Sequence, residues 1–218
     1  MSHPTLTWTD DGTPVASAFD DPYFTGGLAE TQHVFLSGND LPERFVDGFH
    51  IAELGFGTGM NALAVAQAWQ GPGELRFTSF EGFPMRAEDM ERALAPFDLS
   101  HTAALVQGWA AAEGQVRKIR LPGLSLDVHI GDARETLPQW AGCADAWFLD
   151  GFAPARNPEL WGEDLMAQVG RHTVSGGTVA TYTAAGHVRR ALEGAGFAVT
   201  RQQGYGRKKH MTTGRKSA

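Results

Sequence analysis

From residue 50 onward, short strand-like apolar runs alternate with helix-like segments nearly to the end of the 218-residue chain. FHIAEL, LRFTSF and ADAWFL are typical of the strands, and NALAVAQAW and GHVRRALEG are typical of the helices. Such alternation favours an α/β fold, in which parallel strands form one sheet and helices cover both faces. We therefore expect a doubly wound, mostly parallel, seven-stranded sheet. Because ligands bind at the carboxyl ends of such strands, the residues that follow each strand are candidates for a functional site.

The first 45 residues differ from the rest because turn-forming sequences such as SGND dominate them. We expect residues 1–45 to form an arm or lid around one short strand, HVFL (33–36), and residues 46–218 to form the α/β domain. Further along, the pattern of residues 158–173 predicts a single helix that opens with proline.

Composition and charge exclude several classes of protein. With 42% hydrophobic and 20% charged residues, the chain is globular rather than disordered. The single cysteine, Cys143, rules out an internal disulfide and fits a reducing cytoplasm. The start is polar, the longest apolar stretch (51–69) is interrupted by glycines and Glu53, and the histidines are scattered. We therefore expect a cytoplasmic protein without a signal peptide, a membrane span or a metal. The net charge of −7 argues against indiscriminate nucleic-acid binding.

The most distinctive turn, ELGFGTGMN (53–61), links the first strand of this domain to a helix. Glycine permits close approach of the backbone to a ligand, and free N–H groups at a helix start favour an anion. A dinucleotide fingerprint spaces its glycines G-x-G-x-x-G, but Met60 stands at the last of those places. The turn predicts a cofactor site, with a purely structural tight turn as the alternative. The candidate cofactor-binding residues are Glu53, Gly55, Gly57, Gly59 and Asn61.

Two further strands end in acidic residues. Glu81 comes about 20 residues after the glycine turn, where a carboxylate can accept hydrogen bonds from both hydroxyls of a ribose. The alternative is an acid that favours the start of the next helix. Asp132 and Ala133 follow the strand LSLDVHI. There the Asp132 carboxylate can accept from the exocyclic amine of adenine, cap the helix that follows, or do both.

Asp150 follows four apolar residues and precedes the loop Gly151–Pro154. A carboxylate at a strand end, beside a glycine, an aromatic ring and a proline, indicates a functional acid. The alternative is an Asx turn that only stabilises the loop.

Together these motifs resemble the class I S-adenosylmethionine (SAM)-dependent methyltransferases. They resemble in particular the methyltransferase half of the bifunctional tRNA 5-methylaminomethyl-2-thiouridine biosynthesis proteins. The resemblance covers nearly the whole chain, and its most specific part is FLDGFAPARNP (148–158) with Trp161. The other matching segments are residues 21–31, 34–36, 53–61, 79–81, 183–190 and 204–209. This resemblance implies a Rossmann-like class I methyltransferase fold with SAM as the cofactor.

The same resemblance implies SAM-dependent N-methylation of the 5-aminomethyl group on the wobble uridine of tRNA, which gives 5-methylaminomethyl-(2-thio)uridine. Because the chain ends before a second, flavin-dependent domain, we expect a stand-alone methyltransferase, and a monomer rather than an oligomer. Asp150 would accept a hydrogen bond from the neutral amine and take the proton that is released. Binding would hold nitrogen, methyl and sulfur in line.

Four residues are candidates for contacts with the tRNA. Phe152 and Pro154 would wall the pocket, and Phe152 would stack on a flipped base unless it packs in the core. Arg207 and Lys208 belong to a basic tail that would contact phosphates, unless the tail is merely solvated.

Three alternatives compete with this interpretation. One is an N-methyltransferase of the same fold that acts on a small-molecule amine. Another is a nicotinamide-dependent oxidoreductase, against which Met60 argues. The third is a catalytically silent binding module, against which Asp150 argues because a strand end is where catalytic groups lie in this fold.

Overall fold

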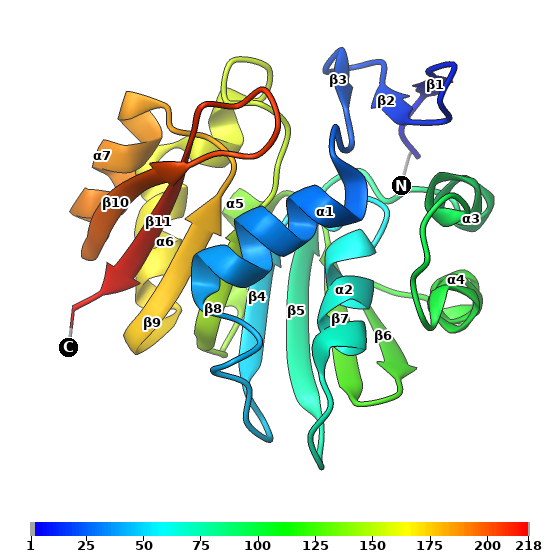
Figure 1. Cartoon of the computed structure of the whole chain (residues 1–218), viewed down its shortest axis with the longest axis horizontal. Helices are drawn as coiled ribbons and strands as arrows, with labels where there is room; N and C mark the ends of the chain where they lie inside the picture. The colour runs from blue at the N-terminus through cyan, green and yellow to red at the C-terminus, as the bar shows by residue number, and fades with distance from the viewer. Residues whose placement is uncertain (1–2, 218) are drawn as a thin grey trace.

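The protein, described over residues 3–217 by a computed structural model, is built on a central sheet of eight strands (Figure 1). Their spatial order is β10-β11-β9-β8-β4-β5-β7-β6. Their bounds are β4 His50–Leu54, β5 Leu75–Glu81, β6 Val116–Leu121, β7 Leu124–Ile130, β8 Ala144–Leu149, β9 Thr173–Thr181, β10 Phe197–Gln203 and β11 His210–Lys216. The strands β9-β8-β4-β5-β7 run parallel, which confirms the predicted doubly wound, mostly parallel sheet.

The sheet has one strand more than the seven expected. Residues 210–216 form a full strand, β11, which lies between β9 and β10 and pairs antiparallel with both. Two basic residues near the end of the chain, Arg215 and Lys216, therefore lie within the sheet. Arg215 pairs with Asp40 at 2.7 Å, and the Lys216 ammonium donates to the Thr173 carbonyl oxygen at 2.8 Å.

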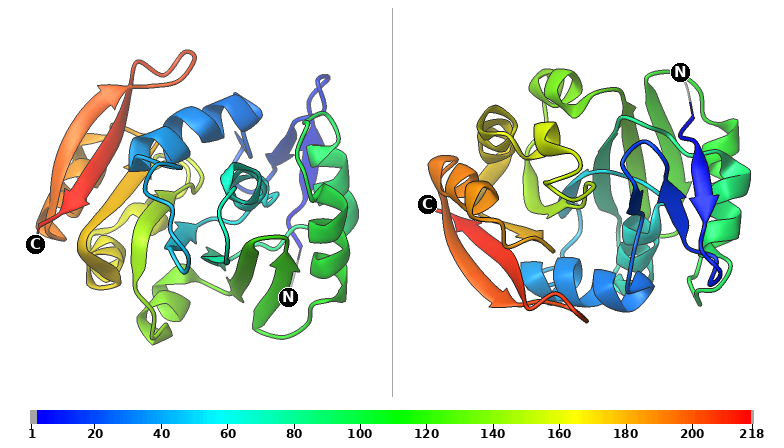
Figure 2. Two further views of the ribbon diagram at one scale, coloured as in Figure 1. Left: turned by 60° about the horizontal axis from the view of Figure 1, so that its bottom comes forward. Right: turned by 90° about the horizontal axis from the view of Figure 1, so that it is seen from above.

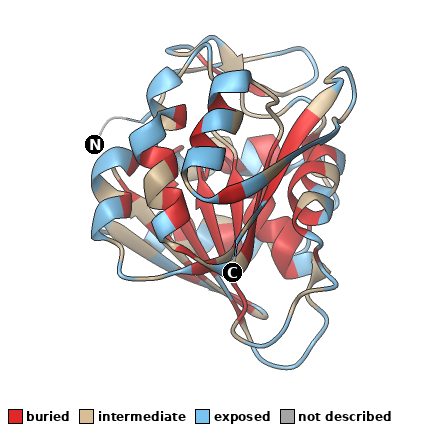
Figure 3. Cartoon of the chain, turned by 90° about the vertical axis from the view of Figure 1, so that its left-hand side faces the viewer, coloured by how far each residue is buried: buried red, intermediate tan, exposed pale blue. Residues whose placement is uncertain are grey.

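Helices cover both faces of the sheet (Figure 2). On one face lie α2 (Met60–Ala68), α3 (Ala87–Leu94) and α4 (Thr102–Ala111), and on the other α5 (Ala133–Thr136), α6 (Glu163–Arg171) and α7 (Gly186–Gly194). Side chains alternate along the strands, so in β8 Phe148 packs toward the first layer, whereas Trp147 and Leu149 pack toward the second. Figure 3 shows the buried residues on the sheet and on the inner sides of the helices.

The arm contains a small antiparallel sheet and a helical segment. The sheet comprises β1 (Leu6–Trp8), β2 (Pro14–Ala16) and β3 (Asp21–Pro22). After it, α1 (Gly27–Thr31) continues as a π-helical turn over Gln32–Leu36 and crosses the face of the main sheet (Figure 1).

The predicted strand at 33–36 is therefore wrong. Val34, Phe35 and Leu36 are consecutive buried residues that pack into the same core as β4, and this packing overrides their local preference for a strand. The division between arm and domain at residue 45 stays a prediction.

The single helix expected over 158–173 is also wrong. Pro158–Trp161 form a 3₁₀ turn, and Gly162 is extended (φ −69°, ψ 155°), so α6 begins only at Glu163. The break lets the buried Trp161 indole donate a hydrogen bond to the Phe152 carbonyl oxygen at 2.9 Å. The turn thus anchors the loop that follows β8.

Within residues 3–217, none of the helices combines the length and apolar character needed to span a bilayer. The same residues contain no group of three or more His, Cys, Asp or Glu side chains arranged to hold a metal ion.

The order of the strands reverses beside β4. The chain builds β4, β5 and β7 in one direction and then returns to place β8 on the opposite side of β4. The loops that leave β4 and β8 therefore diverge, and they open a crevice at the carboxyl ends of these strands.

Candidate active site

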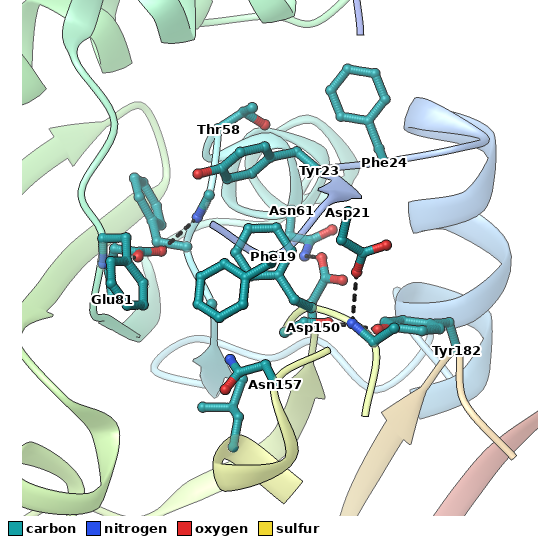
Figure 4. A pocket seen from close by; sticks show the side chains of 18 of the residues that line it. Phe19, Asp21, Tyr23, Phe24, Thr58, Asn61, Glu81, Asp150, Asn157 and Tyr182 are labelled. Atoms are coloured by element: carbon teal, nitrogen blue, oxygen red, sulfur yellow. Dashed lines mark hydrogen bonds between the residues drawn. The ribbon is translucent and has the colours of Figure 1, made fainter. Parts of the chain in front are cut away.

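A cavity of about 440 Å³ lies at the carboxyl ends of the parallel strands, beneath the arm (Figure 4). Each of the five parallel strands contributes a lining residue at or just after its end: Gly55 for β4, Glu81 for β5, Asp132 for β7, Asp150 for β8 and Tyr182 for β9. The predicted site residues that line the cavity are Gly55, Gly57, Asn61, Glu81, Asp132, Ala133, Asp150, Phe152 and Lys208. Glu53, Gly59, Pro154 and Arg207 are not part of the lining.

The glycine turn lies against its neighbours so closely that side chains are excluded. Gly55 has φ +89°, and a Cβ there would collide with the Asp150 carbonyl oxygen. Gly57 has φ +54°, and a Cβ there would come within 3.1 Å of the Tyr23 ring. Both positions need glycine for conformation as well as for space, since L side chains rarely adopt positive φ.

Glu81 ties the end of β5 to the glycine turn. One carboxylate oxygen accepts from the Gly57 N–H at 2.9 Å, and the other accepts from the Phe83 N–H at 2.6 Å. Burial raises the pKa of Glu81, although these backbone donors oppose the rise. The carboxylate is therefore fixed in place at the cavity wall.

Asp150 presents to the cavity a carboxyl group whose pKa lies well above its ordinary value. Burial raises its pKa to about 7, the negative charge of Glu30 adds to the rise, and a hydrogen bond from Asn61 and the charge of Lys208 oppose it. Its Oδ2 accepts from the Asn61 amide at 2.7 Å. Near neutral pH this group is poised between its protonated and charged forms.

Glu53 lies behind Asn61 and is fully buried. Its two oxygens accept from the Asn61 amide at 2.8 Å and from the Ser79 hydroxyl at 2.7 Å. Burial raises the pKa of Glu53 to about 8 despite these two hydrogen bonds. Its carboxyl group thus contacts other protein side chains instead of the cavity.

Lys208 is a half-buried cation that lines the cavity. Its ammonium donates to Glu30 at 2.8 Å and lies 3.9 Å from the centre of the Tyr182 ring. Burial favours a higher pKa for Glu30, but the hydrogen bond and charge of Lys208, with donors from Gly26 and Thr25, bring the net pKa below its ordinary value. Lys208 therefore joins the loop between β10 and β11 to the arm.

Aromatic rings surround the mouth of the cavity. Phe152 stacks on Phe19 with ring centres 4.5 Å apart, and the Tyr23 ring meets Phe152 edge-on at 5.2 Å. Phe83, which is 44% exposed, meets Phe19 edge-on at 5.2 Å. Phe152, which itself lines the cavity, therefore packs against the arm at the mouth.

Asp132 caps α5, as one of its two predicted roles requires. Its carboxylate accepts from the Arg134 N–H at 2.8 Å and pairs with the Arg134 guanidinium. The hydrogen bonds from Arg134 lower the pKa of Asp132. Asp132 also lines the cavity, so its role as a cap is compatible with its other predicted role, which is to accept a hydrogen bond from the exocyclic amine of adenine.

A family profile described as S-adenosyl-L-methionine-dependent methyltransferase matches residues 99–217. The chain belongs to this family. Its cofactor is accordingly SAM.

Two relatives of this methyltransferase carry the name tRNA 5-methylaminomethyl-2-thiouridine biosynthesis bifunctional protein MnmC. The relative from Caulobacter sp. (strain K31) is 42% identical over 96% of this chain, and that from Pseudomonas fluorescens (strain Pf-5) is 43% identical over 98%. The chain spans only 38% and 35% of their respective lengths. The crystal structure of MNMC2 from Aquifex aeolicus matches all of this chain and 72% of its own, with a TM-score of 0.76 at 23% identity, and so supports the fold.

The cavity of the methyltransferase has features that fit SAM. The Tyr23 hydroxyl is buried and has no hydrogen-bond partner among residues 3–217, although Tyr23 lines the cavity. An unpaired buried hydroxyl costs about 1–3 kcal/mol, which a bound ligand would recover. Beside it lie the bare backbone of Gly57 and the fixed carboxylate of Glu81. The Tyr23 hydroxyl, the Gly57 backbone and the Glu81 carboxylate together suit a ligand that carries several polar groups and lies close to the protein backbone.

Several lining residues were not among the candidates from the sequence. Tyr182 follows β9 directly, so the strand-end rule that found Asp150 could have found it as well. Asp21 and Tyr23 lie in the arm segment DPYF, which the family resemblance covers. Glu30 lies in the same matching segment, but its pairing could not be read from local pattern, because its partner Lys208 is 178 residues away.

Proposed function

We propose that this methyltransferase N-methylates the 5-aminomethyl group on the wobble uridine of tRNA, giving 5-methylaminomethyl-(2-thio)uridine. The observation that carries the proposal is Asp150, a half-buried acid in the cavity of a chain that matches relatives named for this modification along nearly its whole length. The substrate implies a reaction in the cytoplasm.

In this proposal the strand ends hold the cofactor. Glu81 accepts from the ribose hydroxyls, Gly55 and Gly57 allow the backbone to approach, and Asp132 and Ala133 contact the adenine. When bound, SAM supplies a methyl group on a positively charged sulfur. The protein needs only to position an amine and manage its proton.

Asp150 accepts a hydrogen bond from the substrate amine and takes the proton released on methylation. A carboxylate also favours the protonated, unreactive amine, and this effect opposes catalysis. In this proposal the positioning of the amine outweighs that effect, because the methyl donor is already cationic and gives up its methyl group readily. Phe152, stacked at the mouth, offers a surface on which a flipped base would rest.

The test replaces Asp150. We expect Asp150→Ala to reduce methyl transfer to tRNA by about 100-fold or more, since a positioned base contributes at least that much. Calorimetry should show SAM affinity within about threefold of the parent, because Asp150 faces the amine. Asp150→Asn keeps the size and the contact with Asn61 and should be similarly impaired.

Nucleoside mass spectrometry of the treated tRNA identifies the product. Rapid turnover by Asp150→Ala would exclude the role of Asp150. Turnover of a small amine but not of tRNA that carries 5-aminomethyluridine would exclude the substrate.

A further inference from the structure

Asn61 uses both of its amide hydrogens inside the protein. The side-chain nitrogen donates to Glu53 at 2.8 Å and to Asp150 at 2.7 Å, while its oxygen accepts from the Thr31 hydroxyl at 2.9 Å. A primary amide has only two N–H donors. No side-chain donor on Asn61 therefore remains for a bound cofactor.

The surroundings are consistent with the direction in which this amide points. A carboxyl group keeps at least one acceptor oxygen whether or not it is protonated, so Glu53 and Asp150 can both accept from the nitrogen, while the amide oxygen accepts from the Thr31 hydroxyl. Glu53 is itself held by the Ser79 hydroxyl at 2.7 Å. A continuous set of contacts thus runs from β5 through β4 and α2 to the end of β8.

The free oxygen of Asp150 lies at the other end of this set. Among residues 3–217, the only hydrogen bond to the Asp150 side chain is the one to Oδ2 from Asn61, and Asp150 lines the cavity. Without Asn61, the carboxyl group could turn about its side-chain bonds. With Asn61, one oxygen is occupied and the second stays available to a substrate.

We propose that Asn61 is a positioning residue that holds the Asp150 carboxyl group for the substrate amine, and that Glu53 acts through Asn61 rather than on the cofactor. This assignment replaces the expectation that both residues bind SAM. It rests on the proposed role of Asp150, and its test therefore includes a measurement that needs no substrate.

The first test is Asn61→Ala. We expect kcat for methyl transfer to fall about 10- to 100-fold, as is typical of a misplaced catalytic group. The SAM dissociation constant should change by less than about threefold. The Asn61 hydrogen bond lowers the pKa of Asp150, so the acidic limb of the kcat/KM profile should move to higher pH.

Glu53 provides the second test. In Glu53→Gln the side-chain oxygen can still accept from Asn61 and the new amide can donate to Ser79, so activity should stay within about threefold of the parent. Glu53→Ala removes both contacts and should behave like Asn61→Ala. Equal loss in the Gln and Ala variants would overturn the role of Glu53.

A matched control separates positioning from lost stability. Asn39 is also fully buried and donates to two carbonyl oxygens, of Phe35 and Trp147, but it lies outside the cavity. Asn39→Ala should lower the melting temperature without moving the pH profile. A SAM affinity about tenfold weaker in Asn61→Ala, with unchanged kcat, would instead make Asn61 a cofactor ligand.

Titration of carboxyl ¹³C signals by NMR, assigned with Asp150→Asn, supplies the measurement without substrate. The Asp150 pKa should rise in Asn61→Ala even if tRNA proves not to be the substrate. An unchanged Asp150 pKa would refute the positioning role alone. Failure of the parent enzyme to methylate tRNA would refute the proposed function alone.

Discussion

Tyr23 is the residue through which the arm offers a polar atom to the cavity. Its ring packs against Gly57 and Phe152, while its hydroxyl is buried without a partner among residues 3–217. Burial and the nearby charges of Glu81 and Asp89 raise the pKa of Tyr23, so it stays a hydrogen-bond donor. A residue that folding leaves unsatisfied is one that a ligand can satisfy.

We predict that Tyr23→Phe weakens SAM binding about five- to tenfold, the value of roughly one hydrogen bond. The protein without SAM should melt at the same temperature or slightly higher, because no internal bond is lost. Titration calorimetry and thermal melts measure the two effects. Tyr205→Phe, outside the lining, is the control, and equal affinity in Tyr23→Phe and the parent would remove the hydroxyl from the site.

At the scale of the element, β4 carries an ionisable group near each end. Glu53 lies near the cavity, and His50 begins the strand at the opposite edge. The His50 ring nitrogen lies 2.8 Å from the Thr78 hydroxyl, and the backbone N–H of His50 donates to the Asp145 carboxylate at 2.8 Å. Burial, together with the charge of Arg76, lowers the pKa of His50 to about 4 despite the opposing charge of Asp145.

The low pKa of His50 makes stability depend on pH. In the unfolded chain His50 has its ordinary pKa of 6.5. Between pH 6.5 and 4 the unfolded state therefore binds a proton at His50, whereas the folded state does not. Stability is therefore retained above 6.5 and falls as the pH drops toward 4, by about 3 kcal/mol from this residue.

Urea unfolding at several pH values tests this prediction. His50→Gln, which can keep the contact with Thr78, should lose part of the decline between pH 6.5 and 4. The exposed His187 gives the matched control His187→Gln. Parallel pH curves for the parent and His50→Gln would show that this histidine is not responsible.

Across the whole molecule, the arm and the loop between β10 and β11 meet above the cavity although they come from opposite ends of the chain (Figures 1 and 2). The Lys208–Glu30 pair joins them, and the His33 ring nitrogen lies 2.9 Å from the Gln203 carbonyl oxygen. Arg207 and Lys209 flank Lys208 on the same loop and are exposed. This loop places two exposed cations beside Lys208, which lines the cavity, in a protein whose net charge is −7.

We predict that reversing both exposed charges, Arg207→Glu with Lys209→Glu, weakens tRNA binding. The dependence of log K on log salt concentration should become shallower, as expected for the loss of about two phosphate contacts. SAM affinity should be unchanged. Lys118→Glu with Arg120→Glu, on the edge strand β6, makes the same change in net charge away from the loop. Filter binding at several salt concentrations compares the two, and equal losses would show that only net charge matters.

Much of the fold and part of the site could be predicted from local pattern. Alternating strands and helices specify a wound sheet, and such a sheet brings its strand ends together, which is why Glu81, Asp132 and Asp150 line one cavity. Residues 33–36 misled prediction because a run of adjacent apolar residues fits a buried strand or a buried helix equally well.

The sequence by itself determined the order of elements, the glycine turn and the acids at the strand ends, because these depend on residues close together along the chain. Tertiary structure alone decided that Glu53 faces Asn61 instead of the cavity, that Lys208 pairs with Glu30, and that Tyr23 reaches the glycine turn. Those contacts join segments that only packing brings together, and burial then sets the acidity of the groups involved.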